Sequence, residues 1–374
     1  MTTPPTVAVD LRALVPEATG IGVYTRDLLA ALTAGGGGRT RYLGLVHRPL
    51  RDPAAMAALG IEVEVEPAPL GVLWQQLTVP RRLARGGVDL FWSPLNTLPV
   101  RCPVPAVVTV HDLTAVLFPE AHTARVRWSI LPFLARSLER AARVVAVSRA
   151  TADDLAFHFP EARAKVRVVA NGVDPRYRPA APEEVARIRR ELGMPEGWVL
   201  YVGTLEPRKN VGTLLRAWEG LKAEDEDFPP LVVAGGTGWK SRAVAKRLGE
   251  LAPWGLRHLG RVDDGRLLAL YQGARAFAYP ALYEGFGLPV LEAMACRVPV
   301  VTSDTSSLPE VAGDAALLVD PRDAGALVAA LRRLVREPAL AAELAGRGEE
   351  RARRFTWARA AAAMEEVFAE SLAG

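Results

Sequence analysis

The chain has 374 residues, of which 50% are apolar and 24% are charged, a composition typical of a globular protein. This length suits two domains of about 150–200 residues each. The composition argues against a membrane-spanning protein, because no apolar run approaches the roughly 18 residues that a membrane helix needs. The first residues show no secretory signal.

The net charge of +4 is unevenly distributed. Residues 1–180 hold 21 Lys and Arg against 15 Asp and Glu, whereas the remainder holds 25 against 27. The basic first half suits an anionic partner, such as a phosphate or an acidic membrane surface; an arginine-rich surface without such a partner explains it equally well. The two cysteines, Cys102 and Cys296, form no spaced ligand pair, which predicts a reducing, cytoplasmic setting.

Continuous apolar runs, typical of buried parallel strands, alternate with helical patterns along the first half. The predicted strands are TVAVDLR (6–12), RYLGLV (41–46), IEVEVE (61–66), DLFWS (89–93), AVVTVHD (106–112), RVVAVS (143–148) and KVRVVAN (165–171). The second half repeats the scheme with WVLYVGT (198–204), LVVAGG (231–236), LRHLGRV (256–262), RAFAYPA (275–281), PVVTSD (299–304) and AALLVD (315–320). This pattern predicts two α/β domains, each with a doubly wound parallel sheet.

The boundary between the domains is predicted in the stretch NGVDPRYRPAAPEE, residues 171–184, which holds three prolines and then begins a new helix. We therefore expect an N-terminal domain at 1–175 and a C-terminal domain at 176–355. Residues 356–374 are expected to form a helix that returns to the N-terminal domain.

Ligands of open parallel sheets bind beyond the carboxyl ends of the strands, so the residues after each strand are candidates for a site. Gly20 and Gly22 lead into a helix after the first strand, and there a backbone can approach a phosphate closely. A simple tight turn explains them as well, and Thr25 breaks the dinucleotide pattern. His111 follows the fifth strand and can contact a sugar or phosphate, although a packed core histidine is the common alternative.

Arg208 and Lys209 follow the first strand of the second half, in the phrase GTLEPRKN. Arg can clamp phosphate oxygens and Lys supplies a point charge, although adjacent surface cations are also common. We expect Lys209 to lie in an open cleft. No His, Cys and Asp residues have the spacing of metal ligands, so no metal site is predicted.

The stretch YPALYEGFGLPVLEAMA, residues 279–295, places two carboxylates on either side of a glycine-rich turn. Glu284 is predicted on the loop and Glu292 about one turn into the following helix. Gly285 and Gly287 allow a tight fold, and amides at the helix start would point at an anion. This layout suits a nucleotide diphosphate-sugar, with one glutamate at the sugar, the other at the ribose, and the diphosphate between them.

EGFGLPVLEAMA resembles the signature of the retaining glycosyltransferases of family 4, which have the two-domain GT-B fold. The resemblance covers nearly the whole chain and extends to GIGVYTRDLL, VHDLT, VVAVSRATADDL, NGVD, GTLEPRKN and LGRVDDGRLLALYQGA. It implies a GT-B architecture with two Rossmann-like domains facing a cleft.

The resemblance also implies roles for the matching residues. Glu284 and His111 would contact the transferred sugar, Arg208 and Lys209 would neutralise the leaving diphosphate, and Glu292 would hold the ribose hydroxyls. Further donor contacts would come from the backbone or side chains of Gly22, Thr204, Arg261, Val262, Phe286, Gly287, Leu288 and Pro289. Thr204 stands where some relatives have Arg, so Arg208 would supply that cation.

The expected activity is transfer of a hexose, with retention, from a nucleotide diphosphate-sugar to an acceptor hydroxyl, with neither metal nor cofactor. Mannose from GDP-mannose, in polysaccharide or glycolipid assembly, is favoured over UDP-sugars. A nucleotide-sugar epimerase of the same fold and a non-catalytic sugar-nucleotide-binding protein are the alternatives. Nucleic acid is not an expected partner.

The resemblance implies a sugar or a lipid-linked sugar as the acceptor, and peripheral contact with an anionic membrane is a further expectation. It rests on residues 123–143, where arginines surround Trp128 and Phe133 in an amphipathic pattern. The alternative is a helix that packs its apolar face on the sheet. Pro132 is expected to kink this helix or to mark its start.

Overall fold

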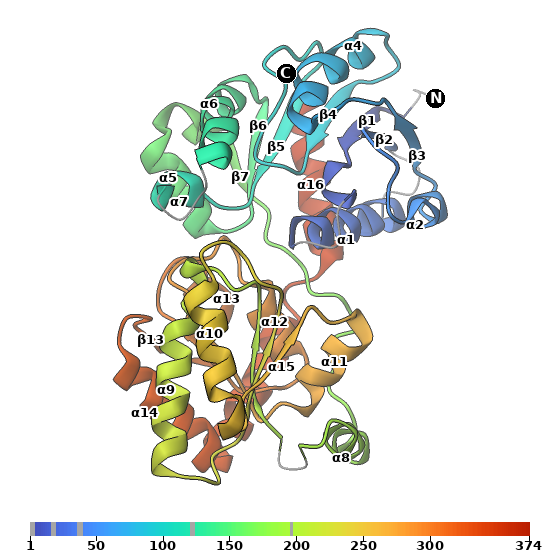
Figure 1. Cartoon of the computed structure of the whole chain (residues 1–374). Coiled ribbons are helices and arrows are strands. Elements are labelled where there is room, and N and C mark those ends of the chain that lie inside the picture. The colour runs from blue at the N-terminus through green and yellow to red at the C-terminus, as the bar shows by residue number, and fades with distance from the viewer. Residues whose placement is uncertain (1–3, 16–19, 36–39, 120–123, 195–196) are drawn as a thin grey trace. The chain divides into compact units, whose positions relative to one another are not determined.

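The computed structural model describes residues 4–15, 20–35, 40–119, 124–194 and 197–374, and the side chains of all of these except 124–130. The chain divides into two compact units (Figure 1). Unit 1 runs to Gly172 and resumes at Thr356–Gly374, and unit 2 is Val173–Phe355. These bounds differ by three residues from the predicted boundary at 175/176.

Unit 1 contains a seven-stranded parallel sheet in the order β3-β2-β1-β4-β5-β6-β7. Its strands are β1 (Thr6–Asp10), β2 (Arg41–Val46), β3 (Glu62–Val65), β4 (Leu90–Ser93), β5 (Ala106–Val110), β6 (Arg143–Ala146) and β7 (Val166–Val168). Its helices are α1 (Gly20–Gly35), α2 (Pro53–Ala58), α3 (Gly71–Leu73), α4 (Val79–Ala84), α5 (Thr114–Leu117), α6 (Ala124–Arg140), α7 (Arg149–His158) and α16 (Trp357–Leu372). The shorter turns are η1 (Arg12–Leu14), η2 (Trp74–Thr78) and η4 (Pro160–Lys165).

Unit 2 contains a six-stranded parallel sheet in the order β10-β9-β8-β11-β12-β13. Its strands are β8 (Val199–Val202), β9 (Leu231–Ala234), β10 (Arg257–Gly260), β11 (Ala276–Tyr279), β12 (Val300–Ser303) and β13 (Ala316–Val319). Its helices are α8 (Pro182–Glu191), α9 (Val211–Glu224), α10 (Arg242–Leu251), α11 (Asp264–Gly273), α12 (Leu288–Ala295), α13 (Leu308–Ala312), α14 (Ala324–Arg336) and α15 (Pro338–Ala352), with η5 (Pro207–Lys209) and η6 (Ala252–Trp254).

The predicted strands are confirmed in both units, and the reason is burial. Strands β4, β5, β9, β11 and β12 are buried along their whole length, which their continuous apolar sequences require. In both sheets the strand order reverses beside the first strand, between β1 and β4 in unit 1 and between β8 and β11 in unit 2. A reversal of this kind opens a crevice at the carboxyl ends of the strands, where doubly wound sheets bind ligands.

Helix α16 belongs to unit 1 although it ends the chain. It packs against α1, as Figure 1 shows in red and blue, and buries Trp357, Met364 and Phe368. The side chain of Thr356 caps its first turn by accepting a hydrogen bond from the Arg359 amide. Glu370 accepts hydrogen bonds from two arginines that begin or lie on strands β6 and β7, Arg143 at 2.8 Å and Arg167 at 3.0 Å.

Helix α6 covers most of residues 123–143, for which the sequence predicts an amphipathic surface helix. Residue 123 and the side chains of residues 124–130, which include Trp128, lie outside the described part. Leu134 and Leu138 are buried in the core of unit 1, so the described part of this helix packs its apolar side on the domain. Pro132 lies inside the helix and does not mark its start. Its side chain is exposed.

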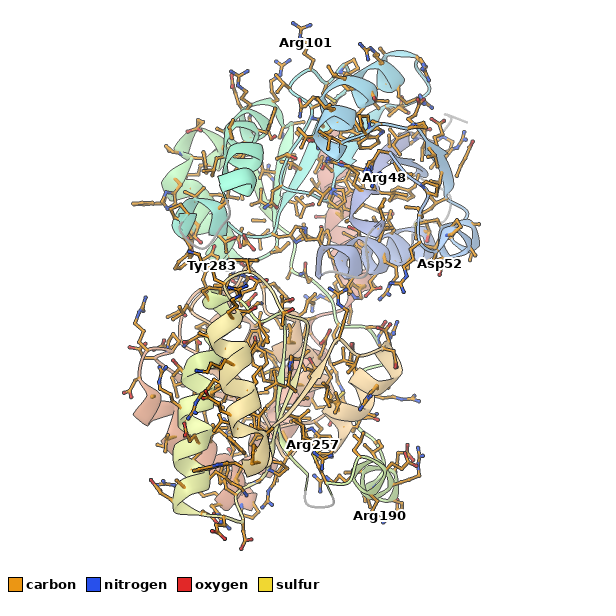
Figure 2. The ribbon with its side chains drawn as sticks, viewed as in Figure 1. Arg48, Asp52, Arg101, Arg190, Arg257 and Tyr283 are labelled. Carbon is orange, nitrogen blue, oxygen red and sulfur yellow. The ribbon has the colours of Figure 1, made fainter. Side chains whose placement is uncertain are left out.

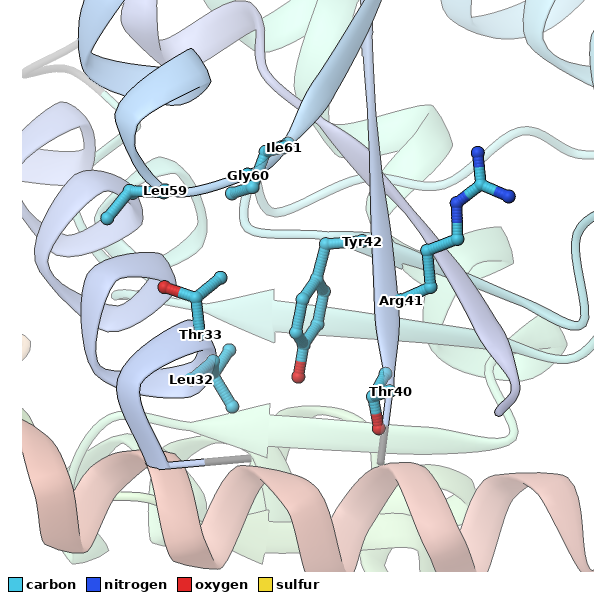
Figure 3. Close-up of a pocket in the computed structure, with 8 residues that line it drawn as sticks. All are labelled: Leu32, Thr33, Thr40, Arg41, Tyr42, Leu59, Gly60 and Ile61. Atoms are coloured by element: carbon cyan, nitrogen blue, oxygen red, sulfur yellow. The ribbon is translucent and has the colours of Figure 1, made fainter. Parts of the chain in front are cut away.

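A pocket of about 270 Å³ lies in unit 1 at the amino edge of the sheet (Figure 3). It is lined by residues from the end of α1, the start of β2 and the turn before β3: Leu32, Thr33, Thr40, Arg41, Tyr42, Leu59, Gly60 and Ile61. Because ligands of such sheets bind at the opposite, carboxyl edge, this pocket is not the candidate active site. Among the described residues, no helix has both the length and the apolar character needed to cross a membrane.

Candidate active site

The candidate site lies in unit 2, where the loops after β8 and β11 meet. These strands are neighbours at the reversal of strand order, so their carboxyl ends are brought together. The Leu282 amide donates to the Arg208 carbonyl at 2.8 Å, and the Asn210 side chain donates to the Pro280 carbonyl at 3.0 Å. Tyr283 marks this edge of the unit in Figure 2, and Arg257, which begins β10, marks the opposite edge.

Lys209 and Glu284 form a buried ion pair at the centre of this site. Each residue is only 8% exposed. The Lys209 ammonium contacts Glu284 Oε1 and donates to the Tyr279 hydroxyl at 2.6 Å. The Tyr279 hydroxyl donates in turn to Glu284 Oε1 at 2.8 Å. The expectation that Lys209 lies in an open cleft is therefore wrong, because the loop after β11 covers it and supplies its counter-ion.

Arg208 contacts the Glu284 carboxylate as well, and it also pairs with the Glu206 carboxylate. Its Nη1 is 3.2 Å from Glu284 Oε1 and 3.3 Å from the Tyr283 carbonyl oxygen, and its Nε donates to Glu206 Oε2 at 3.0 Å. The site thus contains two cations and two carboxylates, all largely buried.

The protonation states follow from this pairing. Burial by itself would raise the pKa of Glu284, but the charges of Lys209 and Arg208 outweigh it and hold that pKa at about 2. Burial lowers the pKa of Lys209, against the opposing effect of Glu284. Burial also raises the pKa of Glu206, although Arg208 lies beside it.

The backbone of Glu284 is fixed by two serines from the loop after β12. Its amide donates to Ser306 Oγ at 3.0 Å, and its carbonyl accepts from Ser307 Oγ at 2.9 Å. Hydrogen bonds from both sides hold the Glu284 backbone in place before any ligand binds.

Helix α12 begins directly after the glycine-rich turn, with Gly287 as its N-cap and Pro289 in its first turn. Gly287 has φ 103°, and a Cβ atom there would come within 2.8 Å of Leu308 Cδ2, so any other residue would be strained at this position. Phe286 packs its ring edge-on against Phe355 at 5.8 Å, which leaves its backbone as the part that can face a ligand. Glu292 lies one turn into α12, as predicted, and accepts a hydrogen bond from the Tyr271 hydroxyl at 2.7 Å.

The remaining predicted donor residues of unit 2 lie along the same edge. Thr204 is exposed and directly follows β8 and Gly203. Arg261 and Val262 follow β10, and Arg261 lies near Gly236 of the loop after β9. The edge therefore runs from Arg261 through Thr204 to Glu284, across neighbouring strand ends.

Two predicted residues, Gly22 and His111, belong to unit 1. Gly22 is buried in the first turn of α1. His111 follows β5, with Nε2 at 2.7 Å from the Pro94 carbonyl oxygen and its ring edge-on to Tyr24 at 4.7 Å. Burial lowers its pKa, which favours the neutral imidazole. These contacts fit the packed-residue alternative, and a sugar contact of His111 stays a prediction.

No group of three or more His, Cys, Asp and Glu side chains in the described ranges is arranged to hold a metal ion. The cations at the site are protein side chains.

Comparison with known proteins identifies the family of both units. Residues 18–177 match the family described as Glycosyltransferase Family 4, and residues 184–354 match Glycosyl transferases group 1. The chain is 36% identical to O-antigen chain mannosyltransferase B of Escherichia coli over 299 residues, and this alignment covers 77% of each protein. The chain belongs to glycosyltransferase family 4.

Other relatives of this glycosyltransferase match over less of their length. The serotype-specific mannosyltransferase WbdA of Escherichia coli is 28% identical over 72% of the chain, which spans 34% of that protein. The D-inositol 3-phosphate glycosyltransferase of Salinispora arenicola is 34% identical over 62% of the chain and 55% of that protein.

Solved structures show that the glycosyltransferase has the GT-B fold. Sucrose-phosphate synthase from Thermosynechococcus elongatus superposes with a TM-score of 0.77 at 23% identity, over 99% of both chains. Anabaena HepE, solved in complex with UDP and glucose, superposes with a TM-score of 0.76 at 18% identity, over 97% of this chain and 99% of that one. The predicted two-domain, doubly wound architecture is confirmed.

Three residues of the glycosyltransferase's site escaped the sequence analysis. Glu206 lies two positions before Arg208, within GTLEPRKN. Its proximity to two adjacent cations in the sequence was the feature that could have identified it as a site residue. Tyr279 ends β11, directly before the glycine-rich loop, and Tyr271 lies in α11. Nothing in their local sequences distinguishes these tyrosines from core aromatic residues, because only the fold brings them to Glu284 and Glu292.

Proposed function

We propose that this glycosyltransferase moves a hexose from a nucleotide diphosphate-sugar to an acceptor hydroxyl with retention of the anomeric configuration. The observation that supports the proposal most is the buried cluster of Lys209, Arg208 and Glu284 at the carboxyl edge of unit 2. Paired cations at the reversal of a doubly wound sheet suit a diphosphate.

The chemistry required of these residues is stabilisation of charge. Transfer breaks the bond between the sugar carbon C1 and the diphosphate oxygen and forms a bond from C1 to the acceptor oxygen, whose proton passes to the departing diphosphate. Negative charge therefore develops on the diphosphate. Fixed cations in a desolvated site stabilise such charge more in the transition state than in the ground state.

Lys209 and Arg208 are the residues proposed to bind that charge. An ammonium has three N–H donors, and Tyr279 and Glu284 accept two of those of Lys209. A phosphate oxygen can take the third. Glu284, held by Ser306 and Ser307, is the carboxylate for the hydroxyls of the transferred sugar, and Glu292 is the carboxylate for the ribose.

The donor sugar is proposed to be mannose and the donor GDP-mannose. The support is the name of the 36% identical relative, an O-antigen chain mannosyltransferase, and of a second, partial relative, a serotype-specific mannosyltransferase. The pathway is proposed to be assembly of a cell-surface polysaccharide or glycolipid.

The test is an assay of the purified chain with GDP-mannose, UDP-glucose and mannose-terminated acceptors, followed by mass spectrometry and by NMR of the new linkage. An acceptor heavier by one hexose, with the anomeric configuration of the donor, is the expected result. Isomerised donor with no transfer would instead show an epimerase, and binding without turnover would show a non-catalytic protein.

Turnover is proposed to need no divalent cation, because Arg208 and Lys209 take the place that magnesium or manganese holds in other transferases. The rate should be unchanged by EDTA in an assay whose buffers have been passed over a chelating resin. A rate that falls with EDTA and returns with magnesium or manganese would contradict this part of the proposal.

Peripheral contact with an anionic membrane is proposed at a different surface from the predicted helix. Exposed leucines gather before and within α3 and η2, where Leu70, Leu73 and Leu77 are 51%, 44% and 50% exposed, and the exposed Arg81 follows on the same side. Leu73, Leu77 and Arg81 follow one another at intervals of four residues through α3, η2 and α4, which places them on one face, and Leu70 immediately precedes α3. Co-sedimentation with anionic vesicles at low salt should fall in the Leu73→Ser/Leu77→Ser variant. It should not change in Phe157→Ser, which removes an exposed ring on α7, outside this leucine cluster. A wild type that stays in the supernatant would favour a soluble acceptor.

A further inference from the structure

The Tyr279 hydroxyl lies between the two charged groups of the site. It accepts a hydrogen bond from Lys209 Nζ at 2.6 Å and donates one to Glu284 Oε1 at 2.8 Å. The ammonium also lies 5.2 Å from the centre of the tyrosine ring. The hydroxyl is thus bonded to both members of an ion pair that donor binding would have to disturb.

We propose that Tyr279 is a positioning residue that holds the Glu284 carboxylate in place when the donor diphosphate draws the Lys209 ammonium away from it. The inference rests on the proposed function and adds a role for a residue outside the predicted set. Tyr279 acts through Glu284 and touches neither donor nor acceptor.

The exchange of partners follows from charge. In the described structure one glutamate and one lysine neutralise each other inside the protein. A phosphate oxygen first takes the third N–H of Lys209; because the diphosphate carries more negative charge than the single charge of Glu284, it then competes with Glu284 for the same ammonium. Glu284 then keeps Arg208, at 3.2 Å, and the Tyr279 hydroxyl. A buried carboxylate that loses a counter-ion needs its remaining hydrogen bonds to stay ionised and oriented.

Tyr279 is fixed tightly enough for this role. Its side chain is fully buried and is stacked between Tyr201 at 5.7 Å and Phe277 at 5.8 Å. Its backbone carbonyl accepts from the Thr302 hydroxyl at 2.9 Å. Lys209, by contrast, has a long side chain with several rotatable bonds, so the lysine is the partner able to move.

Tyr201 provides a matched control. It lies on β8, is fully buried and stacks on the same ring, but its hydroxyl has no hydrogen-bond partner among the described residues. Tyr201→Phe and Tyr279→Phe therefore remove the same atom from neighbouring stacked rings. Only the second removes a bond to Glu284.

The pH dependence has a definite sign. The titratable groups around Glu284 are Lys209, Arg208, Tyr279, Tyr201 and Glu206. The Tyr279 hydrogen bond helps to lower the pKa of Glu284. The acid limb of the kcat–pH profile reports the pKa of Glu284 in the donor complex, where the diphosphate has drawn Lys209 away. Loss of the Tyr279 hydrogen bond should raise that pKa, so the limb should move to higher pH in Tyr279→Phe and stay in place in Tyr201→Phe.

The experiment compares wild type, Tyr279→Phe and Tyr201→Phe in steady-state transfer across pH, with calorimetric binding of GDP and UDP alongside. Tyr279→Phe should lower kcat by roughly ten- to hundredfold, the usual effect of losing a hydrogen bond to a charged group, with little change in KM for the donor. Tyr201→Phe should match wild type. In a Glu284→Gln background, Tyr279→Phe should have little further effect, because the hydroxyl acts through that carboxylate.

Three results would overturn the inference: equal kcat in the two phenylalanine variants, an unmoved acid limb in Tyr279→Phe, or additive losses in the double variant. Should Tyr279→Phe fail to fold, a ring-fluorinated tyrosine at this position, which keeps the hydroxyl and makes it a stronger donor, should move the acid limb to lower pH. No movement with that analogue would contradict the proposal equally. A wild type that neither binds nucleoside diphosphates nor transfers sugar would contradict the proposed function itself.

Discussion

Lys209 is both a residue of the candidate site and a buried charge that the fold must neutralise. Burial of a single cation costs several kcal/mol unless a counter-ion accompanies it, and Glu284 supplies that counter-ion. The sequence predicts Lys209 in an open cleft, where its removal would reduce turnover more than it alters folding. The structure changes that expectation, because removal of the lysine leaves Glu284 buried beside Arg208 alone.

We predict that Lys209→Met loses stability as well as transfer activity. The free energy of unfolding should fall by about 3–5 kcal/mol, the usual effect of breaking a buried pair by removing one partner. The double variant Lys209→Met/Glu284→Gln should regain much of this stability but none of the activity. Urea unfolding curves and transfer assays of the three proteins provide the measurement. A Lys209→Met variant as stable as wild type would show that water reaches Glu284.

We predict that Glu292→Ala weakens donor binding, because the ribose hydroxyls lose a charged acceptor. The expected loss in binding free energy is about 1.5–3 kcal/mol, measured by calorimetry with GDP and UDP. Glu343→Ala, an exposed carboxylate on α15 of the same unit, is the control and should bind both nucleotides like wild type. Unchanged affinity in Glu292→Ala would remove the ribose assignment.

At the scale of elements, the site depends on how two loops leave two adjacent strands. The loop after β8 turns through Asn210, whose φ of 54° is left-handed, and the loop after β11 turns through Gly287 at φ 103°. Each turn starts a helix, α9 or α12, immediately after the cluster. Backbone conformation at these two residues therefore sets where the charged side chains meet.

We predict that Gly287→Ala lowers the free energy of unfolding by about 1–3 kcal/mol, because an alanine is strained at this φ and meets Leu308. Donor affinity should fall with it, since the start of α12 must shift. Gly220→Ala is the matched control. Gly220 lies inside α9 with open space around it, so this variant should gain about 0.5–1 kcal/mol. Chemical denaturation measures the change in the free energy of unfolding of both variants, which should be negative for Gly287→Ala and positive for Gly220→Ala. A Gly287→Ala variant as stable as wild type would show that the turn tolerates a side chain.

At the scale of the whole molecule, the chain builds unit 1 from both of its ends. Gly172 lies in close contact with the returning chain, since a Cβ atom there would come within 2.1 Å of the Trp357 amide nitrogen. Next to it, the Val173 amide donates to the Phe355 carbonyl at 3.1 Å. The two crossings between the units thus run side by side, and α16 completes the core of unit 1 through Phe368, which packs on Trp92 at 5.7 Å.

We predict that deletion of residues 356–374 destabilises unit 1 and makes the protein aggregate. The deletion exposes the surface that Trp357, Met364 and Phe368 cover, and each buried large apolar side chain contributes about 1.5–3 kcal/mol. Thermal unfolding and binding of a hydrophobic dye measure the effect. Glu370→Ala, which removes only the partly exposed contacts to Arg143 and Arg167, should melt close to wild type. A soluble, cooperatively melting truncation would contradict this prediction.

The sequence by itself determined the strands, the two-domain plan and the chemistry of the loop from Tyr279 to Glu292. Strand identity follows from continuous apolar runs and turn identity from glycine and proline, and both are properties of neighbours along the chain. Arg208, Lys209 and Glu284 could be proposed as a site because each lies in the loop that follows a predicted strand.

Tertiary structure alone decided how those residues are paired. The reversal that places β11 beside β8 brings Glu284 onto Lys209, positions 75 residues apart in the chain, and buries both. The same packing gives Tyr279 its two charged partners, gives Glu292 the Tyr271 hydroxyl, and places Leu134 and Leu138 of α6 in a core rather than on a surface. Whether a side chain is buried, and which side chains it contacts, depends on which distant segments become neighbours in space. A local pattern of residues does not contain that information.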